Sequence, residues 1–208
     1  MPISGVILAA GESARLGRPK QLLELDGEPI VRIVVRTATQ SRLDEVVLVV
    51  GANAAEVARA SGDFGQVTVE NQQYNSGQST SLHAGLLAVS PSAEAVIFML
   101  GDQPEVEVDV IDALIETFER SGAAIVQPVY GSTPANPVLF ARSKFPDLMA
   151  IAGDQGARTL IRRLAQGVVR VPVGHGPPPG DVDTDEDYVA LVARWAAKTI
   201  GTTGPTIE

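Results

Sequence analysis

Short apolar runs alternate with longer amphipathic stretches along most of the 208-residue chain. A short apolar run bounded by turn residues is typical of a buried strand, and apolar residues at helical spacing are typical of an amphipathic helix. We therefore predict strands at residues 3–11, 22–25, 46–50, 67–69, 96–100, 123–128, 138–140 and 168–173. The stretches between them predict helices at residues 30–39, 53–60, 79–89, 108–120, 145–151, 155–164 and 186–197. Pro29 suits the start of the first helix, and Asn53 is expected to cap the second.

This order of elements predicts the fold class. Strands that alternate with helices, several of them apolar throughout, predict a doubly wound α/β fold: a mostly parallel sheet with helices on both faces. We expect one domain over residues 1–200 and a flexible tail over residues 201–208, which have no core-forming pattern. Ligands of such sheets bind beyond the carboxyl ends of the strands, where residues distant in sequence can share one pocket.

Composition narrows the classes of function. Hydrophobic residues make up 45% of the chain and aromatic residues only 4%, so we expect an aliphatic core. The absence of cysteine excludes disulfides, thiolate nucleophiles and cysteine-ligated metals. A net charge of -9 without a basic stripe argues against nucleic acid as a partner. No apolar run approaches membrane-spanning length and the N-terminus does not resemble a signal peptide, so we expect a cytoplasmic protein without a membrane partner.

One loop, at residues 11–20, concentrates positive charge. Gly11 and Gly17 allow backbone N–H groups to approach an anion closely. Arg15, Arg18 and Lys20 place three cations within six residues of an acidic chain, which favours a polyphosphate ligand. The spacing is neither that of a P-loop nor that of a dinucleotide fingerprint. A strand followed by a solvated basic loop is the alternative interpretation.

The same loop is similar to a known signature. Residues 8–20 resemble the motif L-A-A-G-x-S-x-R-x-G-x-x-K of the nucleotidyltransferases. Further segments resemble motifs of the MocA-like molybdenum cofactor cytidylyltransferases, within the MobA-like superfamily, so that the resemblance runs through nearly the whole chain. These segments are residues 101–104 (G-D-Q-P), 135–140 (G-[HN]-P-V-L-F), 153–158 (G-D-x-G-A-R) and 181–188 (D-I-D-T-P-E-D-Y).

The resemblance implies a Rossmann-like enzyme that transfers a nucleoside monophosphate, CMP from CTP, to a phosphorylated molybdopterin-type acceptor and releases pyrophosphate. It implies Mg²⁺ or Mn²⁺ as the cofactor, and a molybdoenzyme or its chaperone as a further partner. The nucleotide-binding half would span residues 1–105 and the acceptor-binding half residues 106–200. Ala135 and Asp185 depart from the family motifs, and both lie in the acceptor-binding half.

Individual roles follow from the same resemblance. Arg15, Lys20 and Asp102 would be catalytic, and Asp102 and Asp183 would ligate the metal, with Asp181 as a weaker candidate. The nucleotide-binding residues would be Leu8, Ala9, Ala10, Gly11, Glu12, Ser13, Arg15, Lys20, Gly77, Ser79, Ser81 and Asp102. Mg²⁺ is usually held by one or two carboxylates together with substrate phosphates and waters, so two aspartates suffice.

The acceptor would be contacted by Gln103, Asn136 and Arg158. Arg158 has a structural alternative, an ion pair with Asp154 four residues earlier on the same helix. Residues 75–82, assigned to the base and ribose, could equally cap a helix.

Two further residue pairs have structural interpretations. Asp102 could cap a helix, but it lies too far upstream of the helix that is predicted to begin near Val108. Thr184 and Asp187 have the spacing of a capping box, which is compatible with Asp183 pointing into the site. His83 is expected to pack on its helix rather than to act in catalysis.

Other functions stay open at this point. Guanylyltransferase relatives usually carry Gly where this chain has Ala10, which favours a pyrimidine nucleotide. Sugar-1-phosphate nucleotidyltransferases share the first loop, but residues 136–140 and 153–158 argue against them. The alternative of another class is a catalytically inactive, nucleotide-binding accessory protein for a molybdoenzyme. Arg15, Lys20, Asp102 and Asp183 are all present, which argues against that alternative because an inactive protein has no need to keep all four.

Overall fold

The computed structural model describes residues 1–154, 156–174 and 176–202. This part of the chain is built on an eight-stranded sheet with the order β10-β7-β9-β6-β1-β4-β5, with β8 paired to β7. The strands are β1 (Ile3–Ala9), β4 (Glu45–Val50), β5 (Val67–Glu70), β6 (Ala95–Leu100), β7 (Ile125–Tyr130), β8 (Thr133–Pro134), β9 (Val138–Ala141) and β10 (Val168–Gly174). A separate two-stranded sheet joins β2 (Glu24–Leu25) to β3 (Glu28–Pro29).

The main sheet is mostly parallel, which confirms the predicted fold class. β1 pairs in parallel with β4 and β6, β4 with β5, and β7 with β10. β9 runs antiparallel to both of its long neighbours, β6 and β7. The apolar run at residues 138–140 predicted a strand, but three residues carry no information about its direction.

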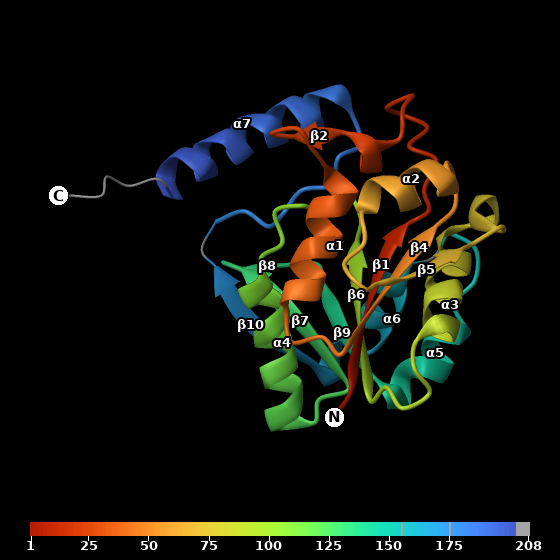
Figure 1. Ribbon diagram of the computed structural model, residues 1–208. Coiled ribbons are helices and arrows are strands. Elements are labelled where there is room, and N and C mark those ends of the chain that lie inside the picture. Colours follow the sequence, from red (N-terminus) through yellow and green to blue (C-terminus); the bar gives the residue numbers. More distant parts are fainter. Residues whose placement is uncertain (155, 175, 203–208) are drawn as a thin grey trace.

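Helices cover both faces of the sheet (Figure 1). One face is covered by α1 (Ile30–Gln40), α2 (Ala54–Ser61) and α4 (Val108–Ser121). Helix α7 (Asp185–Thr202) lies beside β2 and adds Leu191 to the core on this side. The other face is covered by α3 (Gln78–Ala88), α5 (Phe145–Met149) and α6 (Ala157–Arg163). Short 3-10 helices lie in the connections: η1 (Lys20–Leu22), η2 (Tyr74–Ser76), η3 (Arg142–Lys144) and η4 (Ala165–Gly167).

Several local predictions differ from the structure. The run at 22–25 is not one strand, because η1 continues to Leu22 and β2 begins at Glu24. Asn53 occupies the N-cap position of α2, but its φ is 56° and its side chain makes no capping hydrogen bond. Helix α7 continues through residues 201 and 202. Gln155, His175 and residues 203–208 of the expected tail lie outside the described residues.

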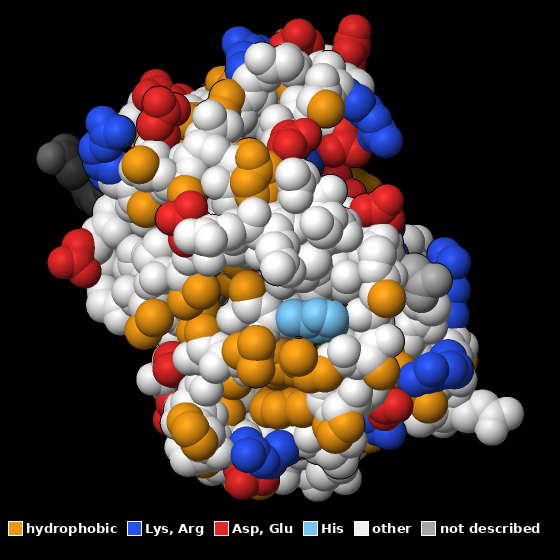
Figure 2. All heavy atoms as spheres, turned by 90° about the vertical axis from the view of Figure 1, so that its right-hand side faces the viewer, with side chains coloured by type: hydrophobic (Ala, Val, Ile, Leu, Met, Phe, Trp, Pro, Cys, Tyr) orange, Lys and Arg blue, Asp and Glu red, His pale blue; other side chains and the backbone are white. Residues whose placement is uncertain are grey.

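Hydrophobic side chains also reach the surface on the side of the molecule that carries α3 and α5 (Figure 2). Leu87 of α3 is 75% exposed and Met149 of α5 is 38% exposed. A ring nitrogen of His83 lies 3.2 Å from the carbonyl oxygen of Leu148, so His83 joins these two helices, as its expected packing role requires.

Helix α3 lies close against the sheet at Gly85. A Cβ atom added there would lie 2.3 Å from Cγ1 of Val6 and 3.1 Å from Cγ2 of Val49. Val6 and Val49 are fully buried on β1 and β4, so their methyl groups have little room to move. The glycine therefore sets the distance between α3 and the strands that carry the candidate site.

We predict that Gly85→Ala lowers the free energy of unfolding by about 1–3 kcal/mol, because overpacking outweighs the better helix propensity of alanine. Gly167→Ala is the control, since an added Cβ meets no atom within 4 Å there, and its stability should stay within about 0.5 kcal/mol of the parent. Urea denaturation measures both. Equal stabilities of the two variants would mean that α3 can shift away from the sheet without loss.

Candidate active site

A cavity of about 840 Å³ opens at the carboxyl ends of β1 and β6 and extends along the sheet beneath α3 and α6. Ligand sites of open α/β sheets occupy this position. Of the residues predicted from the sequence, these line it: Leu8, Ala10, Gly11, Glu12, Ser13, Lys20, Gly77, Ser81, Asp102, Asn136, Arg158, Asp181 and Asp183. Ala9, Arg15, Ser79 and Gln103 are not part of its lining.

The loop after β1 is held compact by its own side chains. The hydroxyl of Ser13 accepts a hydrogen bond from the backbone N–H of Lys20 at 3.1 Å, and Ser13 itself has a φ of 54°. Gln21, buried below the loop, donates its amide to the carbonyl oxygen of Gly11 at 3.3 Å. Gln21 lines the cavity but was missed in the sequence, although it follows the motif lysine directly. Its side-chain oxygen is buried without a hydrogen-bond partner among the described residues.

Charged residues from three parts of the chain meet beside this loop. The amine of Lys20 lies 2.5 Å from Oδ2 of Asp102 and 3.0 Å from Oδ1 of Asp183. Arg15 donates to Oδ2 of Asp183 at 3.0 Å. The pairing of β1 with β6 places Leu8 opposite Leu100, and Asp102 follows two residues later, so the sheet register brings Asp102 to the loop. All four predicted catalytic and metal-binding residues are therefore in one cluster.

Burial governs the ionisation of this cluster. Asp102 is only 5% exposed. Burial, with a smaller contribution from Asp181, raises the pKa of Asp102 in spite of the neighbouring Lys20. Burial alone would lower the pKa of Lys20, but Asp102 and Asp183 outweigh it and the pKa of Lys20 lies above its ordinary value. The lysine thus carries a firmly held positive charge at the mouth of the cavity.

The third cation of the loop has a different partner. Arg18 pairs with Asp185 at 2.6 Å and lies 5.8 Å from the ring of Tyr188. Asp185 is the residue that replaces the usual proline of the family motif. Arg18 and Asp185 are both exposed and neither lines the cavity. The substitution at position 185 therefore serves a contact with the loop.

The start of α7 has the predicted capping box. The hydroxyl of Thr184 accepts from the backbone N–H of Asp187 at 3.2 Å, and Asp187 accepts from the N–H of Thr184 at 2.9 Å. The Thr184 hydroxyl also donates to the Asp187 carboxylate at 2.9 Å. This hydrogen bond first, and then those from the N–H groups of Asp183 and Thr184, lower the pKa of Asp187. The cap fixes the chain immediately after Asp183, and Asp183 points to Lys20, so both interpretations of this segment hold together.

Residues 75–82 contact the loop at residues 153–158. Gly77 packs against the backbone of Gly153, and the N–H of Ser79 donates to the carbonyl oxygen of Gly153 at 3.1 Å. The hydroxyl of Ser81 accepts from Asn71 at 2.9 Å. Gly77 is the N-cap residue of α3 and no side chain caps the helix, so the segment starts a helix, as its structural alternative predicted, without a hydroxyl cap. The segment also brings the 153–158 loop onto the cavity.

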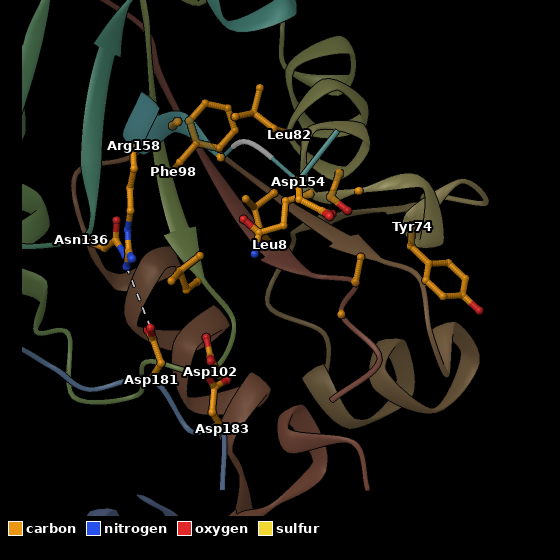
Figure 3. Close-up of a pocket in the computed structure, with 18 of the residues that line it drawn as sticks. Leu8, Tyr74, Leu82, Phe98, Asp102, Asn136, Asp154, Arg158, Asp181 and Asp183 are labelled. Atoms are coloured by element: carbon orange, nitrogen blue, oxygen red, sulfur yellow. Dashed lines mark ion pairs between the residues drawn. The ribbon is translucent and has the colours of Figure 1, made fainter. Parts of the chain in front are cut away.

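Two of the three residues assigned to the acceptor line the cavity, and the third lies behind its wall. Asn136 and Arg158 line the cavity, and the guanidinium group of Arg158 lies 3.9 Å from Asp181 (Figure 3). No ion pair forms between Arg158 and Asp154 in the described part of the chain, so the local alternative is wrong. Gln103 is buried behind the wall and donates to Asp181 at 2.7 Å. Gln103 is thus placed to orient Asp181 rather than to touch a ligand in the cavity.

The carboxylates suit a hard divalent cation. Among the described residues, no three His, Cys, Asp or Glu side chains are arranged to hold a metal ion by themselves. Asp102 and Asp183 share Lys20 as a partner, so their oxygens converge on one place. Two carboxylates are the usual protein contribution to a Mg²⁺ site that is completed by substrate phosphates and water. The residues present fit such an ion.

Comparison with known proteins identifies the family. The model of the MobA-like NTP transferase domain matches residues 5–168. The chain therefore belongs to this family of nucleotidyltransferases. It is 33% identical to the purine catabolism protein PucB of Bacillus subtilis, over 88% of this chain and 93% of that protein. It is 32% identical to nicotine blue oxidoreductase of Paenarthrobacter nicotinovorans, over 91% and 96% of the two chains.

Solved structures agree with this assignment. Rv0371c of Mycobacterium tuberculosis superposes with a TM-score of 0.84 at 32% identity, covering 93% of this chain and 98% of that one. Another structure of Rv0371c is a complex with manganese, with a TM-score of 0.78 at 31% identity and coverage of 93% and 99%. A nucleotidyl transferase of Methanothermobacter thermautotroptrophicus has the same fold, with a TM-score of 0.80 at 21% identity over 95% and 99% of the chains. No helix in the described part of this chain is long and apolar enough to cross a membrane.

We predict that Gly77→Ala destabilises the protein more than Gly65→Ala. Gly77 has φ 114° and ψ 159°, a region that is essentially restricted to glycine. An added Cβ would also lie 2.5 Å from the backbone of Gly153. Gly65 has φ 86° but open space around it, so its variant carries backbone strain alone. Urea denaturation should show a cost of about 1–2 kcal/mol for Gly65→Ala and at least about 1 kcal/mol more for Gly77→Ala. A smaller cost for Gly77→Ala would mean that the 77–81 and 153–154 segments are not tightly joined.

Proposed function

We propose that this protein transfers CMP from CTP to a phosphorylated, molybdopterin-type acceptor and releases pyrophosphate. The observation that carries the proposal is the cluster of Lys20, Asp102 and Asp183 beside a compact glycine-containing loop at the carboxyl edge of the sheet. Cations and backbone N–H groups there suit a triphosphate, and two carboxylates suit its metal ion. Both kinds of group are needed at one place for nucleotidyl transfer.

The reaction asks little covalent chemistry of the protein. The second pKa of a phosphate monoester is about 6, so the acceptor is largely dianionic at neutral pH and needs no general base. An oxygen of the acceptor phosphate attacks the α-phosphorus, and the bond to the bridging oxygen of the leaving pyrophosphate breaks. Lys20 and Arg15 stabilise the charge that develops on the phosphates, and the cavity holds the two reactants in line.

Asp102 and Asp183 would hold Mg²⁺ or Mn²⁺. When bound, such an ion neutralises phosphate charge and helps to orient the triphosphate. The complex of Rv0371c with manganese supports the choice of a divalent cation. Gln103 keeps Asp181 in place beside the two ligands, and Arg158 on the opposite side of Asp181 is available to the acceptor phosphate.

The identity of the nucleotide and acceptor rests on the resemblance to cytidylyltransferases. Ala10, at the place where guanylyltransferases usually carry Gly, lines the cavity and favours the pyrimidine. Asn136 and Arg158, from the two segments that resemble the cytidylyltransferase motifs, also line it. These positions support a molybdopterin-type acceptor over a sugar phosphate.

Similarity to nicotine blue oxidoreductase supplies a second candidate of another class, an oxidoreductase. The two candidates are separated by one set of assays on the purified protein. Nucleotidyl transfer releases pyrophosphate, whereas a reductase consumes NADH or NADPH when it is given a dye acceptor. Pyrophosphate release without consumption of NADH or NADPH supports the transferase, and the reverse result overturns it.

We expect CTP to bind more tightly than GTP, ATP or UTP in calorimetric titrations with Mg²⁺, and EDTA to abolish this preference. The metal dependence follows because Asp102 and Asp183 would otherwise face the triphosphate directly as like charges. A preference for GTP would retain the transferase but contradict the pyrimidine. Equal, metal-independent binding of all four nucleotides would contradict the proposed site.

We predict that Lys20→Ala and Asp102→Asn each reduce pyrophosphate release by at least about 100-fold, as is typical when a group that stabilises transition-state charge is removed. Arg18→Gln is the matched control, because Arg18 belongs to the same loop but pairs outside the cavity. Its turnover should stay within about threefold of the parent, since exposed ion pairs contribute little. Circular dichroism of each variant should show an intact fold. Parental turnover in Lys20→Ala or Asp102→Asn would remove the proposed roles.

A further inference from the structure

The cavity is much longer than a phosphate site. It descends from the charged cluster along one face of the sheet, where Leu100 and Phe98 of β6 line it in succession. Phe98 stands opposite Val138 of β9, and Phe140 stands two residues further along β9. In Figure 3, Leu82 and Phe98 lie at the opposite end of the view from Asp102 and Asp183. The wall of this side therefore changes from charged at Asp102 to apolar at Leu100 and Phe98.

A second cavity, of about 540 Å³, lies beside the first one and shares a lining residue with it. It is lined by Ile125 at the start of β7, and Ile125 is in register with Phe140. Arg162, near the end of α6, lines both cavities. This arginine consequently lies at the far end of the apolar wall, away from Lys20 and Asp102.

Arg162 differs from the arginines beside it. Arg163 pairs with Asp147 at 3.2 Å, and Arg158 lies 3.9 Å from Asp181. The side chain of Arg162 is exposed and makes no hydrogen bond or ion pair with any described residue, although the chain has a net charge of -9. A cation near the end of a helix is favoured by the helix dipole, but that applies to Arg163 as well. The two exposed arginines differ in that only Arg162 lines the cavity that holds the charged cluster.

Arg158 and Arg162 are four residues apart on α6 and both line the first cavity. Residues at this spacing lie on one side of a helix, about 6 Å apart along its axis. Arg158 is close to the charged cluster through Asp181. Arg162 lies one turn further along α6 and is exposed. Two guanidinium groups thus stand one helical turn apart on the α6 side of the cavity, and the β6 and β9 side presents the apolar residues Phe98, Leu100 and Val138.

We propose that Arg162 forms a second anion subsite, for an acceptor that carries a phosphate at one end, a flat apolar body in the middle and another anionic group at the far end. The inference rests on the proposed function for the first phosphate only. The apolar body would lie against Phe98 and Val138. The second anion, a phosphate or a carboxylate, would receive the two parallel N–H groups of Arg162.

The test compares two probes that share one end. Phenyl phosphate has a single phosphate, and hydroquinone bisphosphate has the same ring with a phosphate at each end. Calorimetric titration of the full chain with Mg²⁺ should show about tenfold tighter binding of the bisphosphate, the magnitude of one charge-assisted hydrogen-bonding contact. Arg162→Gln should bring the two affinities to within about twofold, and Arg163→Gln, the matched control, should leave the tenfold preference intact.

Arg162→Lys separates charge from fold, because it keeps the cation and should retain part of the preference. Equal affinities in the parent, absence of bisphosphate binding, or a preference that survives Arg162→Gln would each overturn the subsite. Pyrophosphate release is read separately from the same variants. A parent protein that prefers the bisphosphate but does not transfer nucleotides would contradict the proposed function alone. A parent protein that transfers nucleotides but does not prefer the bisphosphate would contradict the subsite alone.

Discussion

The site depends on the ion pair between Lys20 and Asp102, which lies at the edge of an almost wholly aliphatic core. Removing two charges from water costs several kcal/mol for each ion, and a pair of apolar residues is commonly at least as stable. Stability therefore gives no reason to keep this pair. A site that must attract both an anion and a cation does give one, because the lysine and the carboxylate can each exchange its partner for a ligand of the opposite charge.

The same exchange extends to the rest of the cluster. Asp183 forms ion pairs with both Lys20 and Arg15. The carboxylate that would bind the metal ion therefore neutralises the two cations that would bind phosphate. A metal–triphosphate complex brings charges of both signs, and each protein group gains a new partner as it gives up the old one. The capping box at Thr184 and Asp187 limits how far Asp183 can move. The cluster is thus charge-balanced before and after the ligand binds.

Much of the fold follows from local patterns in the sequence. The apolar runs of β4 and β6 and the glycine-containing loop after β1 are continuous signals, and the alternation of elements predicts the sheet. Partners across the chain have no such signal. From the sequence, only residues on the same helix can be paired by their spacing, and this spacing suggests Asp154 as the partner of Arg158. In the folded chain the partner of Arg158 is Asp181. Gln21 and Arg162 belong to no motif, so only the shape of the cavity reveals them.

The two departures from the family motifs show why position in the sequence is an unsafe guide to function. Both lie in the half expected to recognise the acceptor, which suggests an altered acceptor. In the structure, Asp185 is an exposed partner of Arg18 in the first loop. Ala135 makes backbone hydrogen bonds with Pro128 and Gln127. Neither residue lines the cavity. An altered acceptor cannot be inferred from side chains that would not touch it, and Arg162, which no motif includes, is the better place to look for specificity.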